Sequence, residues 1–201
     1  MKAVKNQVFL CAAFTDLLRR RPDLRAHARL RLVGDGPLRA DCAALLAAGG
    51  CAEAAEFAGD SATVADDLRD MDVFVLPSLA EGISNTILEA MASGTPVVAS
   101  DIDAFSRVLE DGEAGYLFRN EDPADLAFVI NQLLDDPARR EKLSAAGRDR
   151  ASEFDWQTVA ARILDVYASV TVTGERVTED LRGQVIGRLS RRSNDRDEAD
   201  V

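Results

Sequence analysis

The chain has 201 residues, of which 47% are hydrophobic, and this apolar content excludes intrinsic disorder over most of its length. No apolar run approaches the roughly 20 residues that a membrane-spanning helix needs. The formal net charge of -11 argues against nucleic acid as a partner, because binding a polyanion requires an excess of lysine and arginine.

The expected elements alternate between helices and strands along most of the chain. In chain order they are a helix at 6–20, a strand at 30–33, a helix from Pro37 to about Gly49, a strand at 56–58, a helix at 64–71, a buried strand at 73–76, a helix at 84–93, a strand at 96–99, a helix at 105–110, a strand at 115–118, and helices at 124–134, 139–151 and 157–170. Residues 173–201 are mixed in charge and poor in large apolar residues, so we expect a domain over 1–172 and a flexible tail over 173–201.

This alternation predicts an α/β fold, a Rossmann-like parallel sheet with helices on both faces. Ligands bind such sheets at the carboxyl ends of the strands. The loops of interest therefore follow Val33, Phe57, Leu76 and Ala99.

The loop after Val33 carries Gly34 and Gly36, and two glycines allow the backbone to approach a ligand closely. A plain tight turn explains the same residues. The loop lacks the GxGxxG pattern, so it gives little support to a dinucleotide cofactor or an NAD enzyme.

The stretch from Pro77 to Glu89 reads Pro-Ser-Leu-Ala-Glu-Gly-Ile-Ser-Asn-Thr-Ile-Leu-Glu. It places Glu81 between a strand end and the first turn of a helix, where Ser84 and Asn85 are good capping residues. The free amides of Ile83 to Thr86 would form an anion site, and Glu89 could reach ligand hydroxyls. On spacing alone, the better explanation is that Glu81 is a solvent-exposed loop acid and Glu89 an ordinary residue of a helix surface.

Several motifs in the same order resemble the group 1 (family 4 type) glycosyltransferases of the GT-B fold, over roughly residues 2–170. The central one is Glu-Gly-Ile-Ser-Asn-Thr-Ile-Leu-Glu-Ala-Met-Ala-Ser-Gly-Thr-Pro-Val-Val-Ala-Ser, with glutamates 81 and 89 separated by seven residues. The others are Val33-Gly34-Asp35-Gly36-Pro37, Phe57-Ala58-Gly59, and Phe154-Asp155-Trp156 leading to Tyr167. The chain resembles the C-terminal, donor-binding half of that fold.

The resemblance implies a site for a nucleoside-diphosphate sugar. By analogy, Glu81 would contact hydroxyls of the donor sugar and Glu89 the two ribose hydroxyls. Lys5 would neutralise the leaving diphosphate. The remaining implied donor contacts are the amides of Gly82, Ile83, Ser84, Asn85 and Thr86 at the diphosphate, Gly34 and Gly36 along the cleft, and Phe57 to Gly59 at the nucleobase.

The resemblance also implies transfer of a hexose to an acceptor glycan or lipid-linked sugar, with retention of the anomeric configuration. No cofactor is expected, and no metal, because cationic side chains and the helix terminus would stabilise the leaving group. Asp101-Ile102-Asp103 has the spacing of a metal motif, but we interpret it as a loop.

The three cysteines, Cys11, Cys42 and Cys51, form no CxxC pair and are expected to be buried free thiols. A cytoplasmic location is expected, with a peripheral position at the inner face of the membrane as an alternative.

The sequence departs from the family pattern in three ways. This sequence does not include the acceptor-binding domain of the family. It also does not include the first strand of the family pattern, which is central in the usual strand order. Loss of that strand would leave the strands near Val33 and Leu76 without a shared neighbour. The loop after Ala99 reads Asp103-Ala104-Phe105-Ser106-Arg107 instead of two glycines and a Pro-Glu. We therefore expect part of a longer enzyme or a truncated copy of one. A partner-dependent sugar-nucleotide-binding subunit is the alternative, and an epimerase on the same fold is a third.

Overall fold

A computed structural model describes residues 3–170, with side chains described as far as Tyr167. The chain divides into two compact units, Met1–Arg150 and Ala151–Val201. The expected tail at 173–201 and the boundary that precedes it lie outside the described residues.

The strands of the first unit are all parallel and form two sheets. β1 (Leu30–Val33) pairs with β2 (Ala55–Gly59). The second sheet has the order β3 (Phe74–Leu76), β4 (Val97–Ser100) and β5 (Tyr116–Phe118). Within residues 3–170, β1 pairs only with β2, and β3 only with β4. The structure thus shows the predicted division: the strands that end near Val33 and Leu76 have no neighbour in common.

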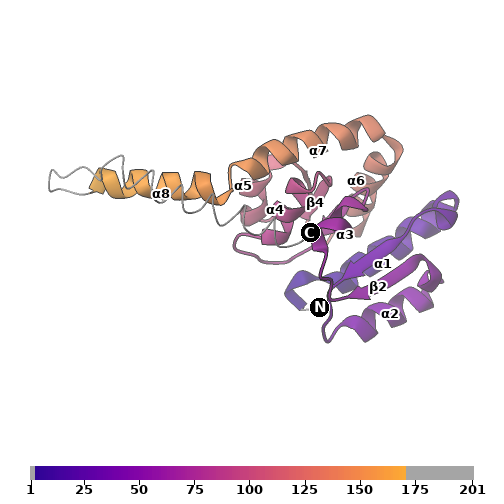
Figure 1. Cartoon of the computed structure of the whole chain (residues 1–201). Coiled ribbons are helices and arrows are strands. Elements are labelled where there is room, and N and C mark those ends of the chain that lie inside the picture. The colour runs from indigo at the N-terminus through magenta and orange to yellow at the C-terminus, as the bar shows by residue number, and fades with distance from the viewer. Residues whose placement is uncertain (1–2, 171–201) are drawn as a thin grey trace, which may run out of the picture. The chain divides into compact units, whose positions relative to one another are not determined.

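The helices of the first unit lie before, between and after the strands in sequence (Figure 1). They are α1 (Gln7–Arg20), α2 (Arg39–Ala48), α3 (Val64–Arg69), α4 (Asn85–Ala92), α5 (Asp103–Val108), α6 (Pro123–Asp135) and α7 (Pro137–Ser152), with short 3-10 helices at Ala3–Lys5, Pro22–Ala26, Ala52–Ala54 and Glu110–Gly112. α1 packs against α2 and α6, and α3 packs against α4. The predicted α/β fold with helices on both faces of parallel strands is confirmed.

The core of the first unit is built around α1. Leu10, Phe14, Leu17 and Leu18 of this helix are buried, because they recur at the spacing of one helix face. The ring of Phe9 stacks on that of Phe118 at 6.0 Å between centroids. The core cluster also contains Leu32 of β1, Val98 of β4 and Leu126 of α6. One contiguous core therefore includes side chains from both sheets, although the sheets share no ladder.

Three sequence predictions need correction. The strand predicted as buried is half-buried at Phe74 and Val75, because β3 lies at the edge of its sheet. α2 begins at Arg39, since Pro37 lies in the turn before it. α5 begins at Asp103, so the expected loop at 101–103 ends in the first residue of a helix.

The prediction of buried free cysteines is confirmed. The cysteines Cys11, Cys42 and Cys51 are buried and unpaired. Among the residues that the structure describes, no helix is long and apolar enough to cross a membrane.

The second unit contains α8 (Trp156–Val170), which starts directly after Asp155. The side-chain oxygens of Asp155 accept hydrogen bonds from the backbone N–H of Thr158 at 2.7 Å and from its hydroxyl at 2.9 Å. A side-chain oxygen that accepts from the backbone N–H three residues later is the geometry of a helix N-cap. Trp156, Ile163, Val166 and Tyr167 are exposed along the helix.

Candidate functional site

The loops that follow β1 and β2 are tied to each other. The N–H of Gly34 donates to the carbonyl of Gly59 over 2.6 Å. Both residues have positive φ, +97° and +73°, which is the region that glycine adopts without strain. No atom lies within 4 Å of the position that a Cβ would take at either residue, so open space adjoins both backbones.

Phe57, the predicted nucleobase contact, is half-buried and already has a cationic neighbour. The guanidinium carbon of Arg39 lies 5.1 Å from the centroid of the Phe57 ring, and the Arg39 side chain donates to the Phe57 carbonyl at 3.4 Å. Sequence reasoning did not select Arg39. Its position in the first turn of the helix after the Gly34–Gly36 loop is the signal that could have found it.

Glu81 and Lys5, 76 positions apart in sequence, form an ion pair beyond the carboxyl end of β3. Lys5 Nζ lies 2.5 Å from Glu81 Oε1, and the two side chains are 31% and 16% exposed. The N–H of Leu79 donates to the carbonyl of Val4 at 2.8 Å, which fastens the 3-10 turn Ala3–Lys5 to the loop that carries Glu81. The structure therefore brings together the two residues predicted to be catalytic.

The amino end of α4 lies a few residues beyond Glu81. Ser84 occupies the N-cap position, and its carbonyl accepts from the N–H groups of Ile87 and Leu88. Ser84 thus takes the cap position expected from the sequence, but its hydroxyl makes no cap hydrogen bond and is buried without a partner among the described residues. The first turn of a helix leaves N–H groups without intrahelical partners, and the anion site at these groups stays a prediction.

The remaining predicted residues of this loop are accessible. Gly82, Ile83 and Asn85 are exposed, and Ile83 reaches 68%. Glu89 is exposed, and its side chain makes no polar contact with any other residue between 3 and 170. The structure does not join Glu89 to Glu81.

Two buried serines were not selected from the sequence: Ser78, which contacts Glu81, and Ser100, which contacts Ser78. The Ser78 hydroxyl donates to Glu81 Oε1 at 3.0 Å, and the Ser100 hydroxyl donates to the Ser78 carbonyl at 2.5 Å. Both serines are 0% exposed. Their position at the carboxyl ends of β3 and β4 is the one sequence signal that points to them.

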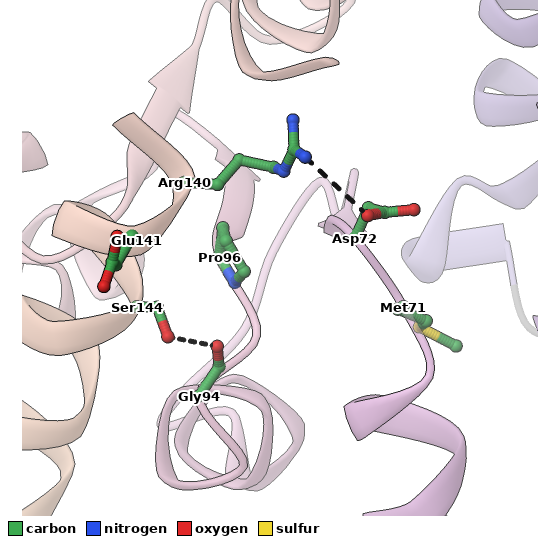
Figure 2. Close-up of a pocket in the computed structure, with 7 residues that line it drawn as sticks. All are labelled: Met71, Asp72, Gly94, Pro96, Arg140, Glu141 and Ser144. Atoms are coloured by element: carbon green, nitrogen blue, oxygen red, sulfur yellow. Dashed lines mark hydrogen bonds and ion pairs between the residues drawn. The ribbon is translucent and has the colours of Figure 1, made fainter. Parts of the chain in front are cut away.

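A surface pocket at the opposite end of the strands is not part of this site (Figure 2). Its lining includes Asp72 and Pro96, which precede β3 and β4. Arg140 in this pocket donates to the carbonyls of Leu133 and Leu134, and the Ser144 hydroxyl donates to the Gly94 carbonyl. These polar groups satisfy helix ends, so they are explained by the fold alone.

In the described part of the chain, no three histidine, cysteine, aspartate or glutamate residues are grouped as metal ligands would be. His27 is exposed.

Comparison with known proteins bears on this arrangement. The family profile described as "Glycosyl transferases group 1" matches residues 1–136, which include Lys5, the Gly34 loop and both glutamates. The chain belongs to the group 1 glycosyltransferases. A curated relative, the phosphatidyl-myo-inositol mannosyltransferase of Mycobacterium leprae, is 44% identical over 133 residues, 65% of this chain and 36% of that protein.

Solved structures of group 1 glycosyltransferases and related enzymes share the fold. Sucrose-phosphate synthase from Thermosynechococcus elongatus matches with a TM-score of 0.72 and 27% identity, over 84% of this chain and 43% of that chain. The C-terminal domain of a group 1 glycosyl transferase, LpcC of Francisella tularensis, matches with a TM-score of 0.66 and 23% identity, over 77% of this chain and 81% of that chain. The fold is that of the C-terminal half of GT-B glycosyltransferases.

This chain spans about a third to a half of the length of the curated relatives that it matches.

Proposed function

We propose that the chain is the donor-binding half of a glycosyltransferase that moves a hexose from a nucleoside-diphosphate sugar to an acceptor, with retention of configuration. The observation that carries this proposal is the Lys5–Glu81 ion pair beside the amino end of α4, in a chain of the group 1 family. A carboxylate, a cation and free backbone amides are the groups that sugar hydroxyls and a diphosphate require.

The leaving diphosphate is the most highly charged part of such a substrate. Lys5 would lie against it and neutralise the charge that develops as the glycosidic bond breaks. The amides from Gly82 to Thr86 would hold the phosphate oxygens at the helix terminus, where the helix dipole favours an anion. Because Lys5 is paired with Glu81 in the free protein, the diphosphate competes with Glu81 for the same ammonium group.

The nucleoside part of the donor would lie toward the first sheet. Glu89, exposed and without a polar partner among residues 3–170, can accept from the two ribose hydroxyls. Gly34 and Gly36 would line the cleft, and Phe57 to Gly59, with Arg39 over the ring, would face the base. A metal ion would not be required, because Lys5 and the α4 amides supply the positive charge.

The acceptor would be a glycan or a lipid-linked sugar. The relative from Mycobacterium leprae is named for mannosyl transfer to phosphatidyl-myo-inositol, so mannosyl donors and inositol lipids are the first substrates to try. A cytoplasmic location with peripheral contact at the inner face of the membrane would suit a lipid-linked acceptor.

Isothermal titration of the 201-residue chain tests donor binding. The ligands are uridine, guanosine and adenosine diphosphates, their glucose esters, and guanosine diphosphate mannose, each with EDTA and again with magnesium. We expect saturable binding of one nucleotide series, equal in both buffers. Glu89→Gln should weaken it, whereas Glu113→Gln, which changes an exposed acid elsewhere, should not. Absence of saturable binding throughout would refute the function, and binding that needs magnesium would refute the metal-free mechanism.

A second candidate, a partner-dependent sugar-nucleotide-binding subunit, is favoured by the divided sheet. Among residues 3–170, β1 and β3 each have one edge that no other strand pairs with, and a parallel strand from another polypeptide could pair there. Transfer activity that requires an added acceptor-domain protein would support this candidate. Transfer by the chain alone would exclude it.

A further inference from the structure

Ser78 is fixed from two sides at the carboxyl end of β3. Ser78 is 0% exposed, and its carbonyl accepts a hydrogen bond from the hydroxyl of Ser100. Ser100 is the last residue of β4 and is also 0% exposed. The Ser78 hydroxyl has Glu81 Oε1 as its acceptor, at 3.0 Å. A buried hydroxyl with a fixed backbone has few alternative orientations, so this bond constrains the glutamate.

The two oxygens of the Glu81 carboxylate have different surroundings. Oε1 takes both the Ser78 hydroxyl and the Lys5 ammonium group. Oε2 accepts no hydrogen bond from any residue between 3 and 170. A carboxylate offers about four acceptor positions, so Oε2 keeps its full capacity for a donor from outside the protein.

Resting on the proposed function, we propose that Ser78 is a positioning residue: its buried hydroxyl fixes Oε1 of Glu81 and so presents Oε2 to a hydroxyl of the donor sugar. Lys5 cannot perform this task alone. Its side chain is long and 31% exposed, and the diphosphate would draw its charge away from Glu81. Ser78 carries no charge, so its hydrogen bond survives when Lys5 changes partner.

The test compares two ligands on the 201-residue chain by isothermal titration. They are the nucleoside diphosphate of the series that binds and the matching nucleoside-diphosphate sugar. Ser78→Ala should leave the affinity for the diphosphate within twofold of the wild type. It should lower the affinity for the sugar ester by about fivefold to tenfold, the worth of one well-placed hydrogen bond.

Ser144→Ala is the matched control, because it also removes a hydroxyl that donates to a neighbouring group, but in the pocket of Figure 2. It should change neither affinity. Thermal unfolding of each variant establishes that it is folded. If Ser78→Ala does not fold, Ser78→Cys replaces it, since a thiol keeps the size and donates more weakly; the same selective loss is then expected, but smaller.

The outcomes are distinct. A wild-type chain that binds neither ligand refutes the proposed function itself. If a Ser78 variant loses affinity for both ligands by the same factor, Ser78 has only a structural role. If its two affinities are in the same ratio as in the wild type, Ser78 does not position Glu81. Either of the last two results overturns the inference and leaves the proposed function standing.

Discussion

At the residue scale, Lys5 is one of only two lysines among the residues with described side chains, the other being Lys142. Lys142 is exposed on α7, whereas Lys5 is partly buried against Glu81. We expect Lys5→Met to weaken nucleoside diphosphate binding by about tenfold to a hundredfold, because a charge-assisted hydrogen bond contributes roughly 1.5–3 kcal/mol. Titration calorimetry measures the loss, and Lys142→Met is the control of equal charge change. If the two variants bind the nucleoside diphosphate with equal affinity, Lys5 does not contribute to the binding site.

Part of this site could be predicted from the sequence and part could not. Helix-terminus physics pointed to the α4 amides, and motif order pointed to Glu81, Glu89 and Lys5. The contact between Lys5 and Glu81 depends on how the 3-10 turn at Ala3–Lys5 lies over the β3 loop, and no local pattern encodes that. Ser78 was missed because a serine after a strand is common, and only its burial reveals its role.

The cysteine thiols provide a second test at this scale. Burial, together with the neighbouring Cys42, raises the pKa of the Cys11 thiol to about 12. The thiolate is the reactive form of cysteine, so a raised pKa keeps this thiol in its unreactive protonated form at neutral pH. We expect Cys11 to resist alkylation in the native protein and to react once urea unfolds the chain. Peptide mass analysis identifies the labelled cysteine, and rapid native labelling at Cys11 would contradict its placement in the core.

At the element scale, α8 depends on its first turn. The backbone N–H of Thr158 and, to a lesser extent, its hydroxyl donate hydrogen bonds to the Asp155 carboxylate. These bonds hold the pKa of Asp155 below its ordinary value of 3.8. A lowered folded-state pKa means that the cap stabilises the helix at pH values above 3.8 and loses this effect as pH falls through the folded-state value. We expect the amides of α8 to lose protection against hydrogen exchange at such low pH, measured relative to the intrinsic exchange rate at the same pH.

Substitution of Asp155 removes the stabilising effect of the cap on α8 at neutral pH. Asp155→Ala should destabilise α8 by about 1 kcal/mol, the usual value of an N-cap side chain. Asp155→Asn keeps an acceptor without a titrating group, so its helix should lose the acid sensitivity. Exchange rates in α8 that do not respond to Asp155→Ala would show that the cap contributes nothing.

The elements themselves were largely predictable, because hydrophobic periodicity and glycine or proline punctuation are local signals. The differences arise where tertiary surroundings decide. Phe74 and Val75 have the composition of a central strand, but their burial depends on a neighbour that the described chain does not supply. Pro37 suits a first helical turn, yet Leu38 has a ψ of 5°, outside regular helix, and forms the N-cap, so α2 starts at Arg39.

At the scale of the whole molecule, one ion pair joins β1 to α3, the helix before the second sheet. Arg31 Nη2 lies 2.7 Å from Asp67 Oδ1, and Asp67 is 7% exposed with its other oxygen buried and unpaired. Arg31→Met would leave a buried carboxylate without a counter-ion. We expect a loss of about 1–3 kcal/mol in the free energy of unfolding, less than for a fully buried pair because Arg31 is partly exposed.

Urea unfolding measures this loss, and Asp67→Asn supplies the control. Combined with Arg31→Met, it removes the stranded charge and should recover part of the stability. If the single variant unfolds at the wild-type urea concentration, the pair does not hold the first sheet to α3.

The fastening of residues 3–5 to the β3 loop has a practical consequence for protein production. Any purification tag joined ahead of Ala3 is attached within a few residues of the ammonium group that pairs with Glu81. A histidine-rich tag placed there would bring additional cations to the diphosphate position and could mimic or block a ligand contact. A tag at the carboxyl end adds no cations next to the Lys5–Glu81 pair, so binding constants should be measured on carboxyl-tagged or untagged protein.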